Sequence, residues 1–317
     1  MKNFATAALL FPVFVAAQAA DPPWPSRPIR LVVSGVAGGS NFTARMIANG
    51  LSPVLGQQVI VDGREGGVIA AEIAARAAPD GYTLHLNGSQ LWLLPFMRAR
   101  VPYDPVRDFI PVTLAVTTPN ILVVHPAVPV KSVRDLIALA RAKPGELNYA
   151  TGNAGTSNHL AAELFKARAG VDMTRIPYKG GAPAINDLIA GQVQLMFGAA
   201  IAVLGHVQTG RLRALAVTTA RPSALAPGLP TVAEAGVPGY ESAAIFGVLA
   251  PARTPAPLVA RLNGAIVGVL NQPETKDRLF KSGSEVVAGT PEAFGAAIKA
   301  EMTTLGKLIK AAGIRDE

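Results

Sequence analysis

Hydrophobic residues along the chain follow two alternating patterns. Short runs of aliphatic and β-branched residues, such as Ile29–Ser34 and 82–86, are typical of buried strands. Between these runs, apolar residues recur at intervals of three and four, as in the segment 44–55, which predicts amphipathic helices. Strands that alternate with helices predict a parallel sheet covered on both faces, so the pattern indicates an α/β protein.

A long extended segment divides the pattern into two series. Residues 112–125 are mostly apolar and are interrupted by Pro119, which predicts a crossover from one domain into another. A helix-capping pattern at 132–135 opens the second series. The proline- and alanine-rich segment 221–230 predicts the return crossover or another inter-domain connection, and the apolar face of 291–312 predicts a final helix packed on the first domain. A chain of 317 residues also exceeds the usual size of a single core, so we expect two domains.

Polar, glycine-bearing loops follow three of the predicted strands, at 35–41, 87–90 and 152–159. Each loop leads into a predicted helix, whose free backbone N–H groups and dipole favour an anion. Ligands of parallel sheets lie beyond the carboxyl ends of the strands, so we expect these loops to face a common cleft. The pattern therefore predicts a binding site for a small anion such as a carboxylate.

Several side chains near these loops have both a structural and a functional interpretation. Trp92 and Phe96 follow one loop, and we interpret them as core aromatics in preference to cleft residues. His159 follows Ser157 in the next helix, and we interpret it as a packing or capping residue in preference to a general base. Tyr178 could stack on a ligand or donate a hydrogen bond to it, or it could belong to a tight turn.

The composition excludes several classes of function. The chain has no cysteine, which excludes disulfides, thiolate catalysis and cysteine-ligated metal sites. Its 4 histidines are scattered without ligand spacing, so we expect neither a metal nor another cofactor. No serine-nucleophile elbow, phosphate-binding loop or dinucleotide fingerprint occurs, and we expect a binding protein with no catalytic residues. The formal charge of +8 is dispersed, so we also expect no nucleic-acid partner.

The first residues have the pattern of a secretory signal. Lys2 supplies the positive charge, residues 4–16 form the apolar region, and 17–19 end it with the small residues of a cleavage site. We therefore expect residues 1–19 to be a signal peptide, removed during export.

Six short motifs together resemble one known family. They are PDGYT at 79–83, PYDPVRDF at 102–109, GTSNHLAAELF at 155–165, PYKGG at 177–181, LRALAVT at 212–218 and PTVAEAG at 230–236. This set resembles the Bug family, the extracytoplasmic solute-binding proteins of tripartite tricarboxylate transporters. The resemblance implies a periplasmic-binding-protein fold, with two doubly wound lobes joined by two crossover segments around a ligand cleft. The implied division is 20–118 plus 240–317 for the first lobe and 119–239 for the second.

The resemblance also implies a location, partners and a set of binding residues. It implies a periplasmic monomer that binds a small carboxylate and delivers it to the permease subunits of a membrane transporter. In the family, the loop after the first strand and the Gly-Thr-Ser loop hold the ligand carboxylate. The implied binding residues are Gly38, Gly39, Ser40, Ser89, Ala154, Gly155, Thr156, Ser157 and Tyr178.

Some positions depart from the family pattern, and two alternatives stay open. The first loop is shorter and lacks an acidic residue, Val68 stands where an asparagine is common, Gly198 replaces an aspartate, and Ile245 replaces a tryptophan. These losses of polar groups favour a more apolar acid as ligand. The alternatives are a secreted hydrolase or isomerase acting on a carboxylate, and a ligand-sensing protein that feeds a signalling receptor.

Overall fold

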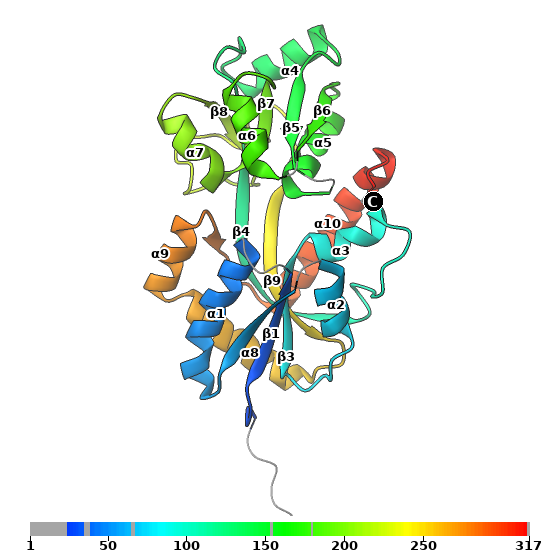
Figure 1. Cartoon of the computed structure of the whole chain (residues 1–317), viewed down its shortest axis with the longest axis vertical. Coiled ribbons are helices and arrows are strands. Elements are labelled where there is room, and N and C mark those ends of the chain that lie inside the picture. The colour runs from blue at the N-terminus through cyan, green and yellow to red at the C-terminus, as the bar shows by residue number, and fades with distance from the viewer. Residues whose placement is uncertain (1–23, 35–38, 65–66, 153–154, 179, 316–317) are drawn as a thin grey trace, which may run out of the picture.

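The two sequence series form two lobes stacked along the long axis of the molecule (Figure 1). The computed structural model describes residues 24–34, 39–64, 67–152, 155–178 and 180–315. The predicted signal peptide, residues 1–19, therefore lies outside the described residues. None of the described helices is long and apolar enough to cross a membrane.

The first lobe, the lower one in Figure 1, is built on parallel strands. Strand β1 pairs in parallel with both β2 and β3 because a helix returns the chain between successive strands. Strand β9 and strand β4 (Phe109–Val124) extend this sheet in the antiparallel sense, and the short β10 pairs with β4. The strands of this lobe are β1 (Ile29–Ser34), β2 (Val59–Arg64), β3 (Thr83–Gly88), β9 (Ala243–Pro251) and β10 (Glu285–Val286). Its helices are α1 (Gly39–Leu55), α2 (Gly67–Ala75), α3 (Gln90–Met97), α8 (Ala256–Leu270), α9 (Pro273–Lys281) and α10 (Pro291–Ala311).

The second lobe repeats the plan on a smaller scale. Strand β5 lies between β6 and β7 and is parallel to both, whereas β7 and β8 are antiparallel to β4. The strands of this lobe are β5 (Asn148–Thr151), β6 (Thr174–Pro177), β7 (Leu195–Ala199) and β8 (Arg213–Val217). Its helices are α4 (Val133–Ala142), α5 (Ser157–Ala169), α6 (Gly181–Ile189) and α7 (Ala200–Gln208). Each sheet is thus mixed, because the strands that cross between the lobes run against their neighbours.

Strand β4 (Phe109–Val124) and strand β9 connect the two lobes. The part of β4 up to Pro119 pairs with β9, and the part from Asn120 onward pairs with β7, so the predicted crossover near Pro119 is confirmed. The prediction that 221–230 returns the chain is wrong, since β9 does so. That segment packs on the second lobe through buried Ala226, with Leu225 and Leu229 half-buried beside it. It also contacts the first lobe, because Ser223 Oγ and the Ala224 N–H donate to Glu285 of β10.

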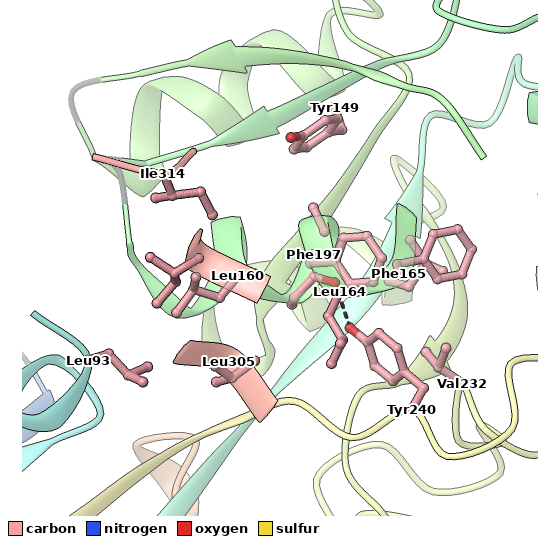
Figure 2. Close-up of a cluster of buried hydrophobic side chains, with 14 of the residues drawn as sticks. Leu93, Tyr149, Leu160, Leu164, Phe165, Phe197, Val232, Tyr240, Leu305 and Ile314 are labelled. Atoms are coloured by element: carbon pink, nitrogen blue, oxygen red, sulfur yellow. Dashed lines mark hydrogen bonds between the residues drawn. The ribbon is translucent and has the colours of Figure 1, made fainter. Parts of the chain in front are cut away.

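Helix α10 packs on the first lobe, as predicted, and also reaches the second. Phe294 meets the Trp92 ring edge-on at 5.9 Å between centroids. Farther along the chain, Leu305 and Ile314 are buried in one hydrophobic cluster with Leu160 of α5 (Figure 2). The cluster therefore continues from one lobe to the other.

Candidate functional site

A cavity of about 360 Å³ lies where the two lobes meet. Its volume falls within the range of about 300–1,000 Å³ that is usual for small-molecule sites. Among the described residues none of its lining side chains is charged. The lining residues are Ser34, Ser40, Asn87, Gly88, Ser89, Gln90, Met97, Gly155, Thr156, Ser157, Leu160, Ser242, Ala243, Ala244, Ile245, Phe246 and Leu305.

Helix N-termini from both lobes open onto this cavity. Helix α1 begins at Gly39 and presents Ser40, and α5 begins at Ser157. Helix α3 begins at Gln90, after Ser89. The first-turn N–H groups of a helix lack intrahelical acceptors, and the dipole adds a partial positive charge there. The site thus offers an anion neutral donors from opposite sides.

The loop before α5 is held by a neutral histidine. His159 is buried, and its Nδ1 accepts the Gly155 N–H at 3.1 Å. Burial lowers the pKa of His159 to about 4, with a further contribution from the charge of Arg175. The predicted capping role is confirmed, and the ring nitrogen that a base would use is already occupied by the loop.

The remaining cavity wall is apolar and comes from elements distant in the sequence. Met97 ends α3, Leu160 lies in the first turn of α5, and Leu305 lies on α10. Ile245 and Phe246 add the start of β9. A ligand with a hydrocarbon portion would find contacts on this side.

Most of the predicted binding residues come together at the cavity. Ser40, Ser89, Gly155, Thr156 and Ser157 line it. Gly39 is the first residue of α1, next to Ser40, whereas Gly38 and Ala154 lie outside the described residues.

Tyr178 does not line the cavity. Its hydroxyl donates to Asp187 of α6 at 2.8 Å. Burial and this carboxylate raise the pKa of Tyr178 to about 12. The side chain therefore serves the packing of its own lobe in this conformation.

The aromatic interpretation near α3 is confirmed for Trp92. Its side chain is fully buried, and its Nε1–H donates to Glu301 of α10 at 2.8 Å. Phe96 packs against the same core and borders an outer groove.

Two departures from the family pattern differ in their position. Ile245 lines the cavity, so an apolar side chain there does change the wall. Gly198 does not line it: a Cβ at this position would lie 2.4 Å from Val203 Cγ1. Packing against α7 therefore favours glycine at 198 whatever the ligand.

The predicted binding set omitted Ser34, Asn87, Gln90, Ser242 and the apolar wall, although Asn87 and Gln90 belong to the loop 87–90 that was expected to face the cleft. Ser34 and Asn87 end their strands on the edge that faces the second lobe, and this position was the available signal. The wall residues carried no such signal, because their apolar character is equally typical of core positions.

Two other hollows are less suited to a small anion. A groove of about 630 Å³ runs between α3 and α10 on the outside of the first lobe, and its lining is largely apolar. A hollow of about 320 Å³ near His125 belongs to the second lobe alone. Within the part of the chain that the structure describes, no group of His, Asp or Glu could hold a metal ion.

Comparison with known proteins identifies the family. Residues 43–314 match the TctC model, the tripartite tricarboxylate transporter family receptor. The chain belongs to this family. It is 39% identical over 290 residues to the UPF0065 protein in the tcbD-tcbE intergenic region of Pseudomonas sp. (strain P51), covering 90% of this chain and 86% of the relative. It is 36% identical over 287 residues to BugT of Bordetella pertussis, covering 88% of this chain and 87% of that protein. The resemblance to the Bug family is thereby confirmed.

Solved structures of family members share the fold. The R. palustris protein Rpa4515 with adipate is 39% identical with a TM-score of 0.76, over 92% of this chain and 99% of that one. MatC from Rhodopseudomonas palustris with bound malate is 28% identical with a TM-score of 0.71, over 90% and 100%. A TctC solute-binding protein from Polaromonas is 26% identical with a TM-score of 0.82, over 91% and 99%. This chain is accordingly a solute-binding protein with a periplasmic-binding-protein fold, and the hydrolase or isomerase alternative finds no support.

Proposed function

We propose that this TctC-family protein captures a small carboxylate in the cavity between its lobes and delivers it, unaltered, to a membrane permease. The observation that carries the proposal is the convergence of the N-termini of α1 and α5, from opposite lobes, on a cavity lined by hydroxyls. Such termini stabilise an anion without a buried cation.

The chemistry of the lining favours one class of carboxylate. Serine and threonine hydroxyls at the helix starts suit the carboxylate oxygens, while Met97, Leu160 and Leu305 suit a hydrocarbon segment. The relatives with bound adipate and malate support a dicarboxylate of short to medium length. Among these, we propose the less polar acids, because Ile245 and Phe246 add apolar surface.

Capture requires the lobes to move about their connections. Strands β4 and β9 are the natural hinge, since β4 changes partners between Pro119 and Asn120. A ligand that contacts both lobes stabilises the closed arrangement by its additional contacts there. We propose the lobe division 20–118 plus 240–317 and 119–239, in which the hinge lies near both divisions. The proposed contact set is that of the sequence prediction without Tyr178, whose hydroxyl is bonded to Asp187. Gly38 and Ala154 of that set lie outside the described residues.

Delivery places the protein outside the cytoplasmic membrane. The pattern of residues 1–19 supports export to the periplasm, where we propose that the mature chain acts as a monomer. The partner is the permease of a tripartite tricarboxylate-type transporter, which the family description supports.

Thermal unfolding of the purified mature chain tests the proposed function. The chain is first unfolded and refolded to remove any ligand carried through purification. It is then mixed with a panel of mono-, di- and tricarboxylates that includes adipate and malate, or with adipamide as a neutral control. A carboxylate at about a hundred times its dissociation constant should stabilise the protein by about 2.7 kcal/mol. That corresponds to a rise in Tm of roughly 2–4 °C per kcal/mol for chains of this general size. Equal shifts with adipamide, or no shift with any mono-, di- or tricarboxylate, would contradict carboxylate capture.

A further inference from the structure

A buried chain of hydrogen bonds leads from the sheet of the first lobe to the cavity. Val32 and Ser34 are two residues apart on β1, and His85 and Asn87 are two residues apart on the adjacent β3. Residues at this spacing share one face of the sheet, and Val32 lies opposite His85. The Val32 carbonyl lies 3.1 Å from His85 Nδ1, and Asn87 Nδ2 lies 3.0 Å from His85 Nε2. The same Nδ2 lies 3.1 Å from Ser34 Oγ, which lines the cavity.

The position of each proton in this chain follows from its partners. A carbonyl only accepts, so His85 Nδ1 must carry the hydrogen that is shared with Val32. His85 is fully buried, and burial lowers its pKa to about 4, so the ring is neutral and Nε2 is an acceptor. The Asn87 amide nitrogen must therefore donate to Nε2.

Asn87 cannot be turned the other way. Its Oδ1 accepts the Gly88 N–H at 2.8 Å. A flipped amide would place N–H groups against this N–H, and its oxygen against the lone pair of His85 Nε2. Both contacts would be repulsive, so the second N–H of the amide is fixed on Ser34 Oγ.

The Ser34 hydroxyl is consequently left with a proton to give. Its oxygen accepts from Asn87, and among the hydrogen bonds of the described residues its own proton has no acceptor. A Cβ built on Gly67, the first residue of α2, would lie 3.7 Å from Ser34 Oγ, so the hydroxyl lies beside another helix start. An oxygen that accepts a hydrogen bond is the group that satisfies this proton.

We propose that Ser34 is a ligand-contacting hydrogen-bond donor, and that His85 and Asn87 are positioning residues that fix the direction of its proton. This inference rests on the proposed capture of a carboxylate and assigns one contact of that site to a residue outside the predicted set. The arrangement favours an acceptor oxygen on the ligand, because Asn87 occupies one lone pair of Ser34 Oγ and the hydroxyl proton is left to donate. An anionic oxygen makes the stronger hydrogen bond of this kind.

Isothermal titration of the refolded mature chain with adipate, malate and adipamide tests the assignment. Ser34→Ala should raise the Kd for the carboxylate roughly 10- to 100-fold, the range for a hydrogen bond to a charged group. Ser34→Thr keeps the hydroxyl and should restore most of the affinity. Ser26→Ala is the matched control, because that hydroxyl faces Tyr82 on an exposed part of the same lobe.

The positioning role requires coupling between Asn87 and Ser34. Asn87→Ala should weaken carboxylate binding in the wild-type chain and change it less than about twofold in the Ser34→Ala chain, because coupled residues are not additive. Additive losses would overturn the positioning role. A Ser34→Ala variant with the same carboxylate Kd as the wild type would overturn this inference alone. A wild-type chain that binds neither carboxylate would overturn the proposed function as well.

Discussion

Met97 and Gly155 meet across the junction between the lobes. A Cβ placed on Gly155 would lie 2.4 Å from Met97 Sδ, and Gly155 has a φ of +74°. Both residues line the cavity, one from α3 and one from the loop before α5. Glycine at 155 therefore allows the second lobe to approach the first without distortion of the loop before α5.

We expect Gly155→Ala to weaken ligand binding by holding the lobes apart. Positive φ costs a non-glycine residue about 1–2 kcal/mol, and the contact with Met97 adds a clash. Gly170→Ala is the matched control, since Gly170 also has positive φ but nothing lies within 4 Å of its added Cβ.

Calorimetric Kd values and Tm separate the two effects. Gly170→Ala should lower Tm with little change in Kd, whereas Gly155→Ala should change both. Adding Met97→Ala to Gly155→Ala should recover part of the affinity. If affinity falls equally in both glycine variants, the clash with Met97 has no part in closure.

The lowered pKa of His85 predicts a loss of stability in acid. Burial lowers its folded-state pKa to about 4, below its ordinary value of 6.5, so the unfolded chain takes up the proton first. Its contribution is present above pH 6.5 and is lost as pH falls toward 4. A shift of this size corresponds to about 3 kcal/mol.

His85→Gln isolates that contribution. Glutamine can donate to Val32 and accept from Asn87 without titrating in this range. We expect the variant to show a flatter decline in the free energy of unfolding between pH 6.5 and 4 than the wild type, measured by urea denaturation. His206→Gln, on the last turn of α7, is the control for the substitution itself.

The raised pKa of Glu301 predicts that stability falls as the pH rises, which is the opposite pH dependence. Burial raises the pKa of Glu301 to about 7, although nearby Ser89 and the hydrogen bond from Trp92 lower it. The folded chain thus holds this proton more tightly than the unfolded chain. Its contribution is present below the ordinary pKa of 4.5 and is lost as pH rises through 7.

Glu301→Gln should make Tm less sensitive to pH between 6 and 8. The amide oxygen can still accept from Trp92 Nε1, and there is no carboxylate to ionise. Glu292→Gln, in the exposed first turn of the same helix, is the control. Identical Tm profiles for Glu301→Gln and the wild type would contradict a raised pKa at 301.

Leu305 predicts selectivity for ligand length. It is 7% exposed and forms part of the apolar cavity wall. Leu305→Ala should weaken binding of adipate more than that of malate, because the longer hydrocarbon segment loses more contact area. The truncation should also lower stability, by roughly 2–5 kcal/mol for a buried leucine.

Titration of Leu305→Ala with both acids checks this selectivity. Val106→Ala, at an exposed apolar position outside the cavity, should leave both Kd values unchanged. Equal weakening for the two acids would mean that Leu305 supports the fold without contacting the ligand.

The local parts of the site could be predicted from the sequence. Ser40 and Ser157 follow strand endings and lie in first helical turns, and both signals lie within a few residues of each other in the chain. The same is true of the His159 cap, which spans four residues, and of the Ser132 cap on Asp135. The crossover at Pro119 was predictable because no single lobe needs so long a strand.

By itself, then, the sequence determined the alternation of strands and helices, the crossing strand and the anion-favouring loops, because these depend on periodicity and on neighbouring residues. Only the tertiary structure decided which side chains of these loops reach the cavity and what completes the wall. Ser34 and Asn87 are 53 residues apart, and their hydrogen bond depends on the register of β1 and β3. Leu305 reaches the cavity because α10 packs back across the first lobe, and Tyr178 is turned toward Asp187 by the packing of α6. Such contacts depend on how elements distant along the chain are packed, and hydrophobic periodicity records which face of an element is buried but not which element covers it.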